Sequence, residues 1–254
     1  MLLLLLPFAY LLTPGSQAGE IIGGREVMPH SRPYMALVTI QSQRDKRSCG
    51  GFLIREDVVV TAAHCNCNLR NITVLLGAHD IALGQQDEPQ RQQILVRRRI
   101  PHPEYNDEMF QNDIMLLQLK EKAKLSRAIA TISVSKKKAK EGSVCSVAGW
   151  GRTSSKAKVQ PVTTLQEVEL KVMSSDLCHS LFHQYYVPSK MLCMGDPKKR
   201  KASFQGDSGG PLICDGKVKG VVSYGRDDGS PPRVFTRVSE YVLWIRKTLR
   251  HLRP

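Results

Sequence analysis

The segment Gly206-Asp207-Ser208-Gly209-Gly210-Pro211 (GDSGGP) places a serine among glycines directly before a predicted strand. Glycines around a serine let the backbone approach a substrate closely and point its amide groups at one place. The same letters satisfy the G-x-S-x-G pattern of α/β hydrolases, in which the acid and the histidine follow the serine. The rest of the chain decides whether GDSGGP is this hydrolase motif or a serine loop of another fold, because the hydrolase fold needs strands and helices in alternation.

Short strand signals dominate the chain, at a spacing of about ten residues that is typical of an all-β barrel or sandwich. This pattern excludes the hydrolase interpretation. Only the end is predicted to be helical, because apolar residues follow Ser239, a suitable N-cap, at helical spacing as far as Leu252. Docking of this helix on the chain's own barrel is favoured over the alternative, membrane binding. The expected strands are 33–40, 50–54, 57–63, 72–78, 93–100, 113–119, 143–150, 164–172, 220–225 and 234–238, with a hairpin that turns at Asp215-Gly216.

Residues 1–18 are predicted to be a signal peptide, because the apolar run Leu2–Leu12 is too short to span a bilayer and small residues precede the cleavage point at Ala18. The alternative is a short membrane anchor, and we find no other stretch apolar enough to form a transmembrane segment. In an oxidising compartment the seven cysteines should pair, with at least one left over. The chain has no CxxC pair and its histidines are scattered, so we expect no metal site and no cofactor.

The formal net charge of +14 exceeds what a solvated surface needs and predicts polyanionic partners. Exported proteins seldom meet nucleic acid, so we expect sulfated glycosaminoglycans or proteoglycan and no nucleic acid as a specific ligand. The alternative is that the basic clusters are dispersed and only keep the protein soluble. The clusters lie at 97–99, 136–140, 198–201 and in the last helix.

A second motif, VTAAHC at residues 60–65, supplies a base for the serine at His64. Together with GDSGGP, the motifs IIGG, TAAHC, NDIMLLQL, AGWGR and VSYG resemble the chymotrypsin-like serine proteases from Ile21 to the C-terminal helix. The stretches PHSRPYMA, GAHDI and QNDIMLLQL are similar to the branch of granzymes, cathepsin G and mast-cell chymases. The resemblance implies an all-β fold of two six-stranded Greek-key barrels plus a C-terminal α-helix, at about 21–135, 136–238 and 239–252, with the active site between the barrels.

The resemblance implies that Ser208 is the nucleophile, His64 its base and Asp113 the residue that orients the base, in peptide hydrolysis through an acyl-enzyme. The backbone amides of Gly206 and Ser208 would form the oxyanion hole. The segment Ser223-Tyr224-Gly225 would pair with the substrate backbone as an added strand. Taken alone, Asp113 would be a helix or turn cap, but its place between the other two motifs favours the triad. A second hypothesis is a basic effector that acts by binding polyanions, although such a protein has no use for a complete triad.

The same resemblance implies a precursor that needs processing. Gly19-Glu20 would be an activation dipeptide removed by a dipeptidyl peptidase, since Glu20 gives trypsin no basic residue to recognise. The freed amine of Ile21 would pair with Asp207 and order the oxyanion hole and the pocket, because an unpaired Asp207 would be a costly buried charge. The precursor is therefore expected to be inactive, to be stored in a secretory granule of the cytolytic or mast-cell type, and to act outside the cell after release. Serpin inhibitors are further expected partners.

The branch implies the disulfides Cys49–Cys65, Cys145–Cys214 and Cys178–Cys193. The further disulfide that borders the pocket in trypsin-like members is absent from this chain, which has Phe204 at one of the two cysteine positions. Cys67 is left over: it is buried and inert, which we favour, or competes with Cys65 for Cys49, or links two molecules. Asn71-Ile72-Thr73 is the one glycosylation sequon of the chain, and in a secreted protein we expect Asn71 to be glycosylated.

Ala202 and Arg233 decide the expected cleavage specificity. In the family, the residue six before the nucleophile lies at the base of the primary pocket, and Ala202 replaces the aspartate that selects Lys or Arg. Arg233, after two prolines, would by itself be a solvated surface charge. Aligning VSYG and FTRV with the family instead places it on a pocket wall, as in granzyme B, whose matching arginine binds an acidic side chain. A charge-assisted contact with a carboxylate implies cleavage after Asp, with Glu weaker. The alternatives are that Arg233 pairs with an acid such as Asp227, or shortens the pocket for medium apolar residues. The alternative protease function is chymase-like cleavage after apolar or aromatic residues.

Overall fold

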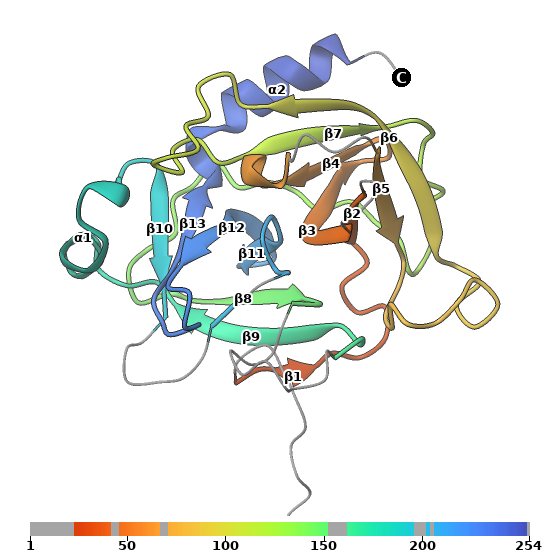
Figure 1. Cartoon of the computed structure of the whole chain (residues 1–254), viewed down its shortest axis with the longest axis horizontal. Helices are drawn as coiled ribbons and strands as arrows, with labels where there is room; N and C mark the ends of the chain where they lie inside the picture. The colour runs from red at the N-terminus through yellow and green to blue at the C-terminus, as the bar shows by residue number, and fades with distance from the viewer. Residues whose placement is uncertain are drawn as a thin grey trace, which may run out of the picture.

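A computed structural model describes residues 23–41, 46–66, 71–151, 162–195, 202–203 and 206–252 of the chain. Figure 1 shows two β-units beside each other, with a helix across the first of them. Within these ranges, no helix combines the length and the apolar composition that spanning a membrane requires.

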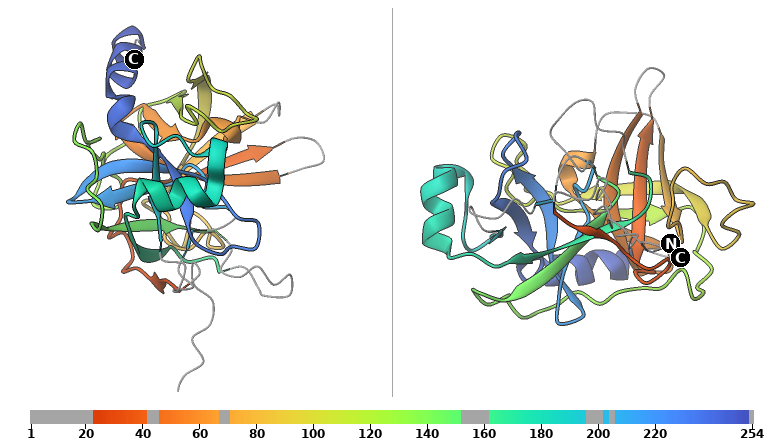
Figure 2. Two further views of the ribbon diagram at one scale, coloured as in Figure 1. Left: turned by 90° about the vertical axis from the view of Figure 1, so that its left-hand side faces the viewer. Right: turned by 90° about the horizontal axis from the view of Figure 1, so that it is seen from below.

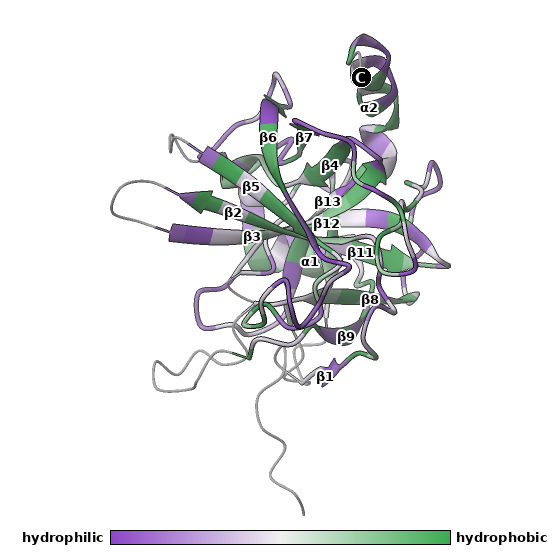
Figure 3. Ribbon diagram, turned by 90° about the vertical axis from the view of Figure 1, so that its right-hand side faces the viewer, coloured by the Kyte–Doolittle hydropathy of each residue, from purple (hydrophilic) through white to green (hydrophobic). Residues whose placement is uncertain are grey.

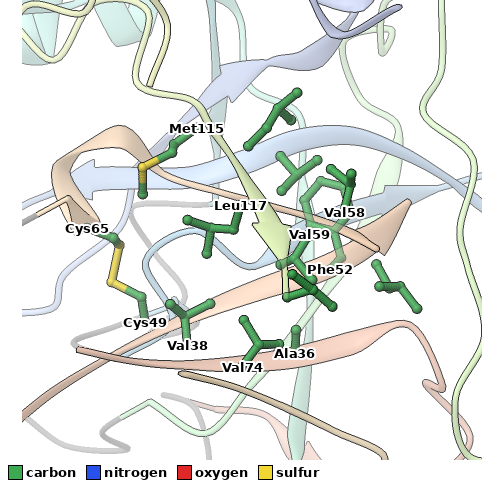
Figure 4. Packing of buried hydrophobic residues seen from close by; sticks show 14 of the residues in the cluster. Ala36, Val38, Cys49, Phe52, Val58, Val59, Cys65, Val74, Met115 and Leu117 are labelled. Atoms are coloured by element: carbon green, nitrogen blue, oxygen red, sulfur yellow. A yellow bond between two sulfur atoms is a disulfide. The ribbon is translucent and has the colours of Figure 1, made fainter. Parts of the chain in front are cut away.

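The first unit is a closed barrel of antiparallel strands in the order β2-β3-β4-β7-β6-β5. Its side chains alternate between the inside and the outside, and inward-facing apolar residues such as Val38, Phe52 and Leu117 fill the interior (Figure 4). The strands are β2 (Met35–Gln41), β3 (Lys46–Arg55), β4 (Val58–Thr61), β5 (Asn71–Leu76), β6 (Gln92–Pro101) and β7 (Met115–Leu119).

The second unit is a curled sheet in the order β1-β9-β8-β11-β12-β13-β10. Hydrogen bonds from Met173 N to Cys193 O and from Gly195 N to Lys171 O, both 2.9 Å, join the β9 and β10 ends. Six of its strands therefore close on themselves, and the expected all-β fold of two six-stranded barrels is confirmed. The strands are β1 (Arg25–Glu26), β8 (Val144–Gly149), β9 (Gln166–Lys171), β10 (Met191–Met194), β11 (Pro211–Cys214), β12 (Lys217–Gly225) and β13 (Arg233–Arg237).

The hairpin expected at Asp215-Gly216 joins β11 to β12. Both residues have positive φ, 52° and 68°, which is the conformation of a tight primed turn. The sequence prediction is confirmed at this position, and the turn sends β12, which contains Ser223 and Gly225, back beside β11.

The helix prediction was wrong in two respects: the cap of the C-terminal helix and the number of helices. Helix α2 runs from Val242 to His251 after a 3₁₀ turn at Val238–Glu240, so Ser239 lies in that turn and does not cap the helix. A second helix, α1 (Ser175–Phe182), was not expected. Ser174 accepts a hydrogen bond from Leu177 N, so the signal for α1 was an ordinary serine N-cap before a helix of only two turns.

The first strand and the last helix that the structure describes each pack on the half to which they do not belong in sequence. Strand β1 pairs with β9 of the second sheet, so the first part of the expected 21–135 half lies outside the first barrel. Helix α2 follows β13 but packs Ile245 into the core of the first barrel, and Leu252, directly after the helix, packs into the same core. Figure 2 shows α1 on the second barrel and α2 projecting along the first. The two barrels are therefore linked by β1 near the start of the described chain and by α2 near its end.

Candidate active site

His64 and Asp113 are brought together by the pairing of two strands of the first barrel. His64 lies in a 3₁₀ turn directly after β4, and Asp113 lies two residues before β7, whose Met115 is the partner of Thr61 in β4. The carboxylate of Asp113 accepts hydrogen bonds from His64 N at 2.9 Å and faces His64 Nδ1 at 2.8 Å. These two contacts fix the ring and place the Nδ1 proton on the side of Asp113.

The electrostatics of this pair favour a protonated imidazole. Asp113 is completely buried, and its Oδ2 also accepts a hydrogen bond of 2.5 Å from Ser223 Oγ in the second barrel. Burial lowers the pKa of His64, but the charge and hydrogen bond of Asp113 together outweigh it, so the pKa lies above its ordinary value of 6.5. His64 can therefore hold a proton while a reaction proceeds.

Ser208 is held against the first barrel by its backbone. Gly50 N donates a 2.7 Å hydrogen bond to Ser208 O, and Cys65, the neighbour of His64, has its Sγ 3.9 Å from the same oxygen. Gly209 has φ +85°, and a Cβ there would overlap Thr61 Oγ1 and lie 2.5 Å from Gly50 O. Only glycine allows this approach. The glycines of GDSGGP therefore seat the serine beside the turn that carries His64.

No hydrogen bond joins the Ser208 hydroxyl to His64 within the described residues. Catalytic hydrogen bonds of this kind are often long in free enzymes and shorten when a substrate binds. The backbone contacts, and not this bond, set the position of Ser208 here.

The amides of Gly206 and Ser208 lie on either side of Asp207. Gly206 has φ +100°, and neither amide donates a hydrogen bond within the described part of the chain. Asp207 is completely buried, and its carboxylate accepts a 2.9 Å hydrogen bond from Gly151 N. The arrangement leaves two donors available for an oxyanion. Ile21, the expected partner of Asp207, lies outside the described residues.

Arg233 is buried rather than solvated. It faces Gly225 across β12 and β13, and only 8% of the residue is exposed. Its Nη1 donates a 2.7 Å hydrogen bond to Arg226 O. Burial lowers the pKa of Arg233, and the charges of Asp207, Asp227 and Asp228 oppose that shift. The alternative of a solvated surface charge, considered from the sequence, is therefore wrong.

Two features of the site were missed from the sequence. Ser203, next to the fully buried Ala202, is itself fully buried, and its hydroxyl has no hydrogen-bond partner among the described residues. The aromatic ring of Phe110 lies 5.9 Å from that of His64 and 5.3 Å from that of Tyr224, which in turn lies 5.7 Å from Phe182. Adjacency to Ala202 could have identified Ser203, but the aromatic contacts join residues far apart in sequence and gave no local signal.

The cysteines form the three disulfides implied by the resemblance, Cys49–Cys65, Cys145–Cys214 and Cys178–Cys193. Cys49, Cys65 and His64 form the one group of three potential metal ligands in the described ranges, and the disulfide occupies both of its sulfur atoms. Asn71 is exposed at the start of β5. Cys67, Phe204 and the basic cluster 198–201 lie outside the described residues.

Comparisons with known proteins agree with this geometry. A family model described as Trypsin matches residues 21–245. Granzyme B of Homo sapiens is 51% identical over 97% of this chain and 98% of its own length. Cathepsin G of Homo sapiens is 49% identical over 97% of this chain and 94% of its own length. A solved structure described as "Structure of GrC" has a TM-score of 0.84 at 45% identity and covers 91% of this chain and 100% of that chain.

Proposed function

The chain belongs to the trypsin family of serine proteases, as an endopeptidase similar to granzymes and cathepsin G, and from this premise we propose that it cleaves peptide bonds after aspartate. Ser208, His64 and Asp113 form its triad. The observation that supports the reaction is the double contact between Asp113 and His64 beside the Ser208 loop. The observation that supports the specificity is the buried guanidinium of Arg233 beside Gly225.

The reaction proceeds in two proton-coupled steps. His64 takes the proton of Ser208 Oγ while that oxygen attacks the scissile carbonyl carbon, and the amides of Gly206 and Ser208 stabilise the oxyanion. The imidazolium returns the proton to the leaving amine, which departs and leaves an acyl-enzyme. Water, deprotonated by His64 in the same way, hydrolyses the ester and restores Ser208. Asp113 stabilises the imidazolium throughout and does not itself take a proton.

Arg233 selects the residue before the cleaved bond. The substrate backbone pairs with Ser223–Gly225, which directs the adjacent substrate side chain toward the base of the pocket at Ala202. A buried cation is costly beside an apolar side chain, whereas a carboxylate offers it a charge-assisted hydrogen bond. The hydroxyl of Ser203, which has no hydrogen-bond partner in the part of the chain that the structure describes, supplies a further donor at the base. Glu binds less well because its extra methylene must be accommodated.

Activation and storage follow the same pattern. Removal of residues 1–18 and of Gly19-Glu20 frees Ile21, whose amine pairs with Asp207, and the complete burial of that carboxylate supports this pairing. Relatives whose names are granzyme and mast cell protease indicate a secretory granule as the location. The exposed basic residues of β6 and α2 bind sulfated glycosaminoglycan, and serpins inhibit the released enzyme.

Matched peptides that carry Asp, Glu, Phe, Met or Lys before the scissile bond test the specificity on the processed enzyme. Cleavage after Asp should dominate and should be lost in Arg233→Gly. Arg226→Gln is the control. The Arg226 side chain is exposed in the loop between β12 and β13, and Arg226 contacts Arg233 through its backbone carbonyl. Preference for Phe or Lys over Asp, or an unchanged preference in Arg233→Gly, would reject the proposal.

A further inference from the structure

The backbone around Asp113 is constrained independently of its carboxylate. Asn112 has the left-handed φ of +57°, and Ile114 N donates a 2.8 Å hydrogen bond to Asn112 O, which closes a tight turn around Asp113. Such a turn directs the side chain at its centre. The direction of the Asp113 carboxylate therefore depends on how firmly Asn112 and the Asp113 carbonyl are held.

Tyr241, the residue before helix α2, holds Asn112. Its hydroxyl donates a 3.1 Å hydrogen bond to Asn112 Oδ1, while Asn112 Nδ2 donates to Glu104 O at 2.6 Å. Tyr241 and Asn112 are both buried. Because this hydrogen bond is buried, its loss leaves the Asn112 Oδ1 acceptor buried and unsatisfied.

The ring of Tyr241 is fixed by packing, separately from its hydroxyl. The imidazole of His102 meets it edge-on with ring centres 5.3 Å apart, and lies 5.0 Å from the ring of Trp244 in α2. His102 N in turn donates to Ile114 O at 2.9 Å. Removing only the hydroxyl should therefore leave the ring in place.

Thr236, in strand β13 of the second barrel, holds Asp113 from the other side. Its buried Oγ1 donates a 2.7 Å hydrogen bond to Asp113 O. Thr236 and Tyr241 lie five positions apart in one continuous segment, which leaves the second barrel, turns through Val238–Glu240 and enters α2 on the first barrel. Figure 1 shows this passage from β13 to α2.

We propose that Thr236 and Tyr241 are positioning residues of the protease reaction, which clamp Asn112-Asp113 from the segment that links the second barrel to α2. Neither residue touches substrate. They act by holding the Asp113 carboxylate where it meets both the amide and the Nδ1 of His64, an alignment on which proton transfer depends steeply. The inference rests on the triad roles proposed above.

The test uses the processed enzyme with Tyr241→Phe, Thr236→Val and the two changes combined, each a change of similar shape. Loss of one buried hydrogen bond should lower kcat about threefold to tenfold per change while KM stays the same. The acid limb of the kcat/KM–pH profile should move to lower pH, because a displaced Asp113 stabilises the imidazolium less. Thr236→Ser, which keeps the hydroxyl, should restore both values.

Leu243→Ala is the control, because this α2 side chain is 80% exposed and faces away from the barrel core. Rates are expressed per active site, so that partial unfolding does not count as lost catalysis. Unchanged kcat and an unchanged acid limb in both single variants, with or without a lower melting temperature, would overturn the inference. A wild-type enzyme with no triad-dependent activity would instead reject the proposed function.

Discussion

Gly225 and Arg233 face each other across β12 and β13, and the arginine occupies the space that a side chain at 225 would need. A Cβ at Gly225 would lie 2.5 Å from Arg233 Cζ, Nε and Nη1. The absent side chain of Gly225 therefore makes room for a buried cation beside the strand proposed to bind the substrate.

Gly225→Ala should displace Arg233 and reduce cleavage after Asp. The expected fall in kcat/KM for Asp peptides is roughly 10- to 100-fold, the value of a charge-assisted hydrogen bond that no longer forms. Gly84→Ala is the control, since a Cβ at that loop position would meet only Asp87 Oδ2, at 3.6 Å. Retention of full Asp cleavage in Gly225→Ala would show that Arg233 does not bind the substrate from its present position.

Removal of the triad side chains should abolish catalysis while the fold persists. We expect Ser208→Ala and His64→Ala each to lower kcat by about 10⁶, and Asp113→Asn by about 10⁴. Burst titration and steady-state kinetics on the processed enzyme measure these losses, and circular dichroism checks the fold. Near-normal proteolysis by Ser208→Ala would reject the assignment of the nucleophile.

The pH dependence should report the raised pKa of His64. His64 must be neutral to accept the Ser208 proton, so kcat/KM should rise with pH through a midpoint above 6.5, the ordinary value for histidine. In Asp113→Asn the midpoint should move to lower pH, because burial still lowers the pKa while the opposing charge is gone. Profiles on one peptide that carries Asp before the scissile bond measure both midpoints. A wild-type midpoint below 6.5 would contradict the electrostatic account.

The processed protein should bind heparin with a steep dependence on salt, because each neutralised anion releases counterions. Arg246, Lys247 and Arg250 are exposed on α2, and Figure 3 shows hydrophilic segments on both α2 and β6. Replacing these three residues by Glu should lower the salt needed for elution from a heparin column by more than three times the effect of Lys217→Glu, an exposed lysine outside the clusters. Wild-type elution at or below physiological salt would argue that the charge only keeps the protein soluble.

Arg55 should contribute to the stability of the docked C-terminal helix. Its guanidinium contacts both carboxylate oxygens of the buried Asp57 and donates to Leu249 O at 2.9 Å and Leu252 O at 3.3 Å, so it closes the C-terminal end of α2. Arg55→Met should lower the free energy of unfolding by about 2 kcal/mol, measured by urea denaturation.

The control for Arg55 is Lys122→Met. This lysine pairs with Glu56 at 3.6 Å, with both side chains about half exposed, and such a pair contributes less than about 1 kcal/mol. Equal losses for the two variants would mean that Arg55 adds nothing beyond an ordinary surface charge.

The features that the sequence predicts well are those determined by a few consecutive residues. Strands such as β4 and β7 are continuous β-branched or apolar runs, and Asp215-Gly216 has the composition of a primed turn, so local preference and fold agree. Motif resemblance placed His64, Asp113 and Ser208 on the three segments that the structure brings together. Helix α1 was missed because two turns with one buried residue, Cys178, give little periodic signal.

The features that sequence could not predict depend on contacts between distant segments. The burial of Arg233 follows from its register with Gly225 and from the turn that brings Arg226 O to its guanidinium. Tyr241 looks like the apolar start of an amphipathic helix, and only the packed structure joins its hydroxyl to Asn112, 129 positions earlier. Tertiary context gives these side chains their roles.

The packing of β1 on the second sheet and of α2 on the first barrel has a consequence for cleavage of the chain between the two halves. A break in the exposed linker near Lys136–Lys138 would leave two fragments, each retaining a piece that completes the other's half: β1 on the second sheet and α2 in the core of the first barrel. The triad would be divided between the fragments, with His64 and Asp113 on one and Ser208 on the other. Such a nicked protein should remain a single particle. If the two fragments are instead produced separately and mixed, the appearance of protease activity would show that they have assembled.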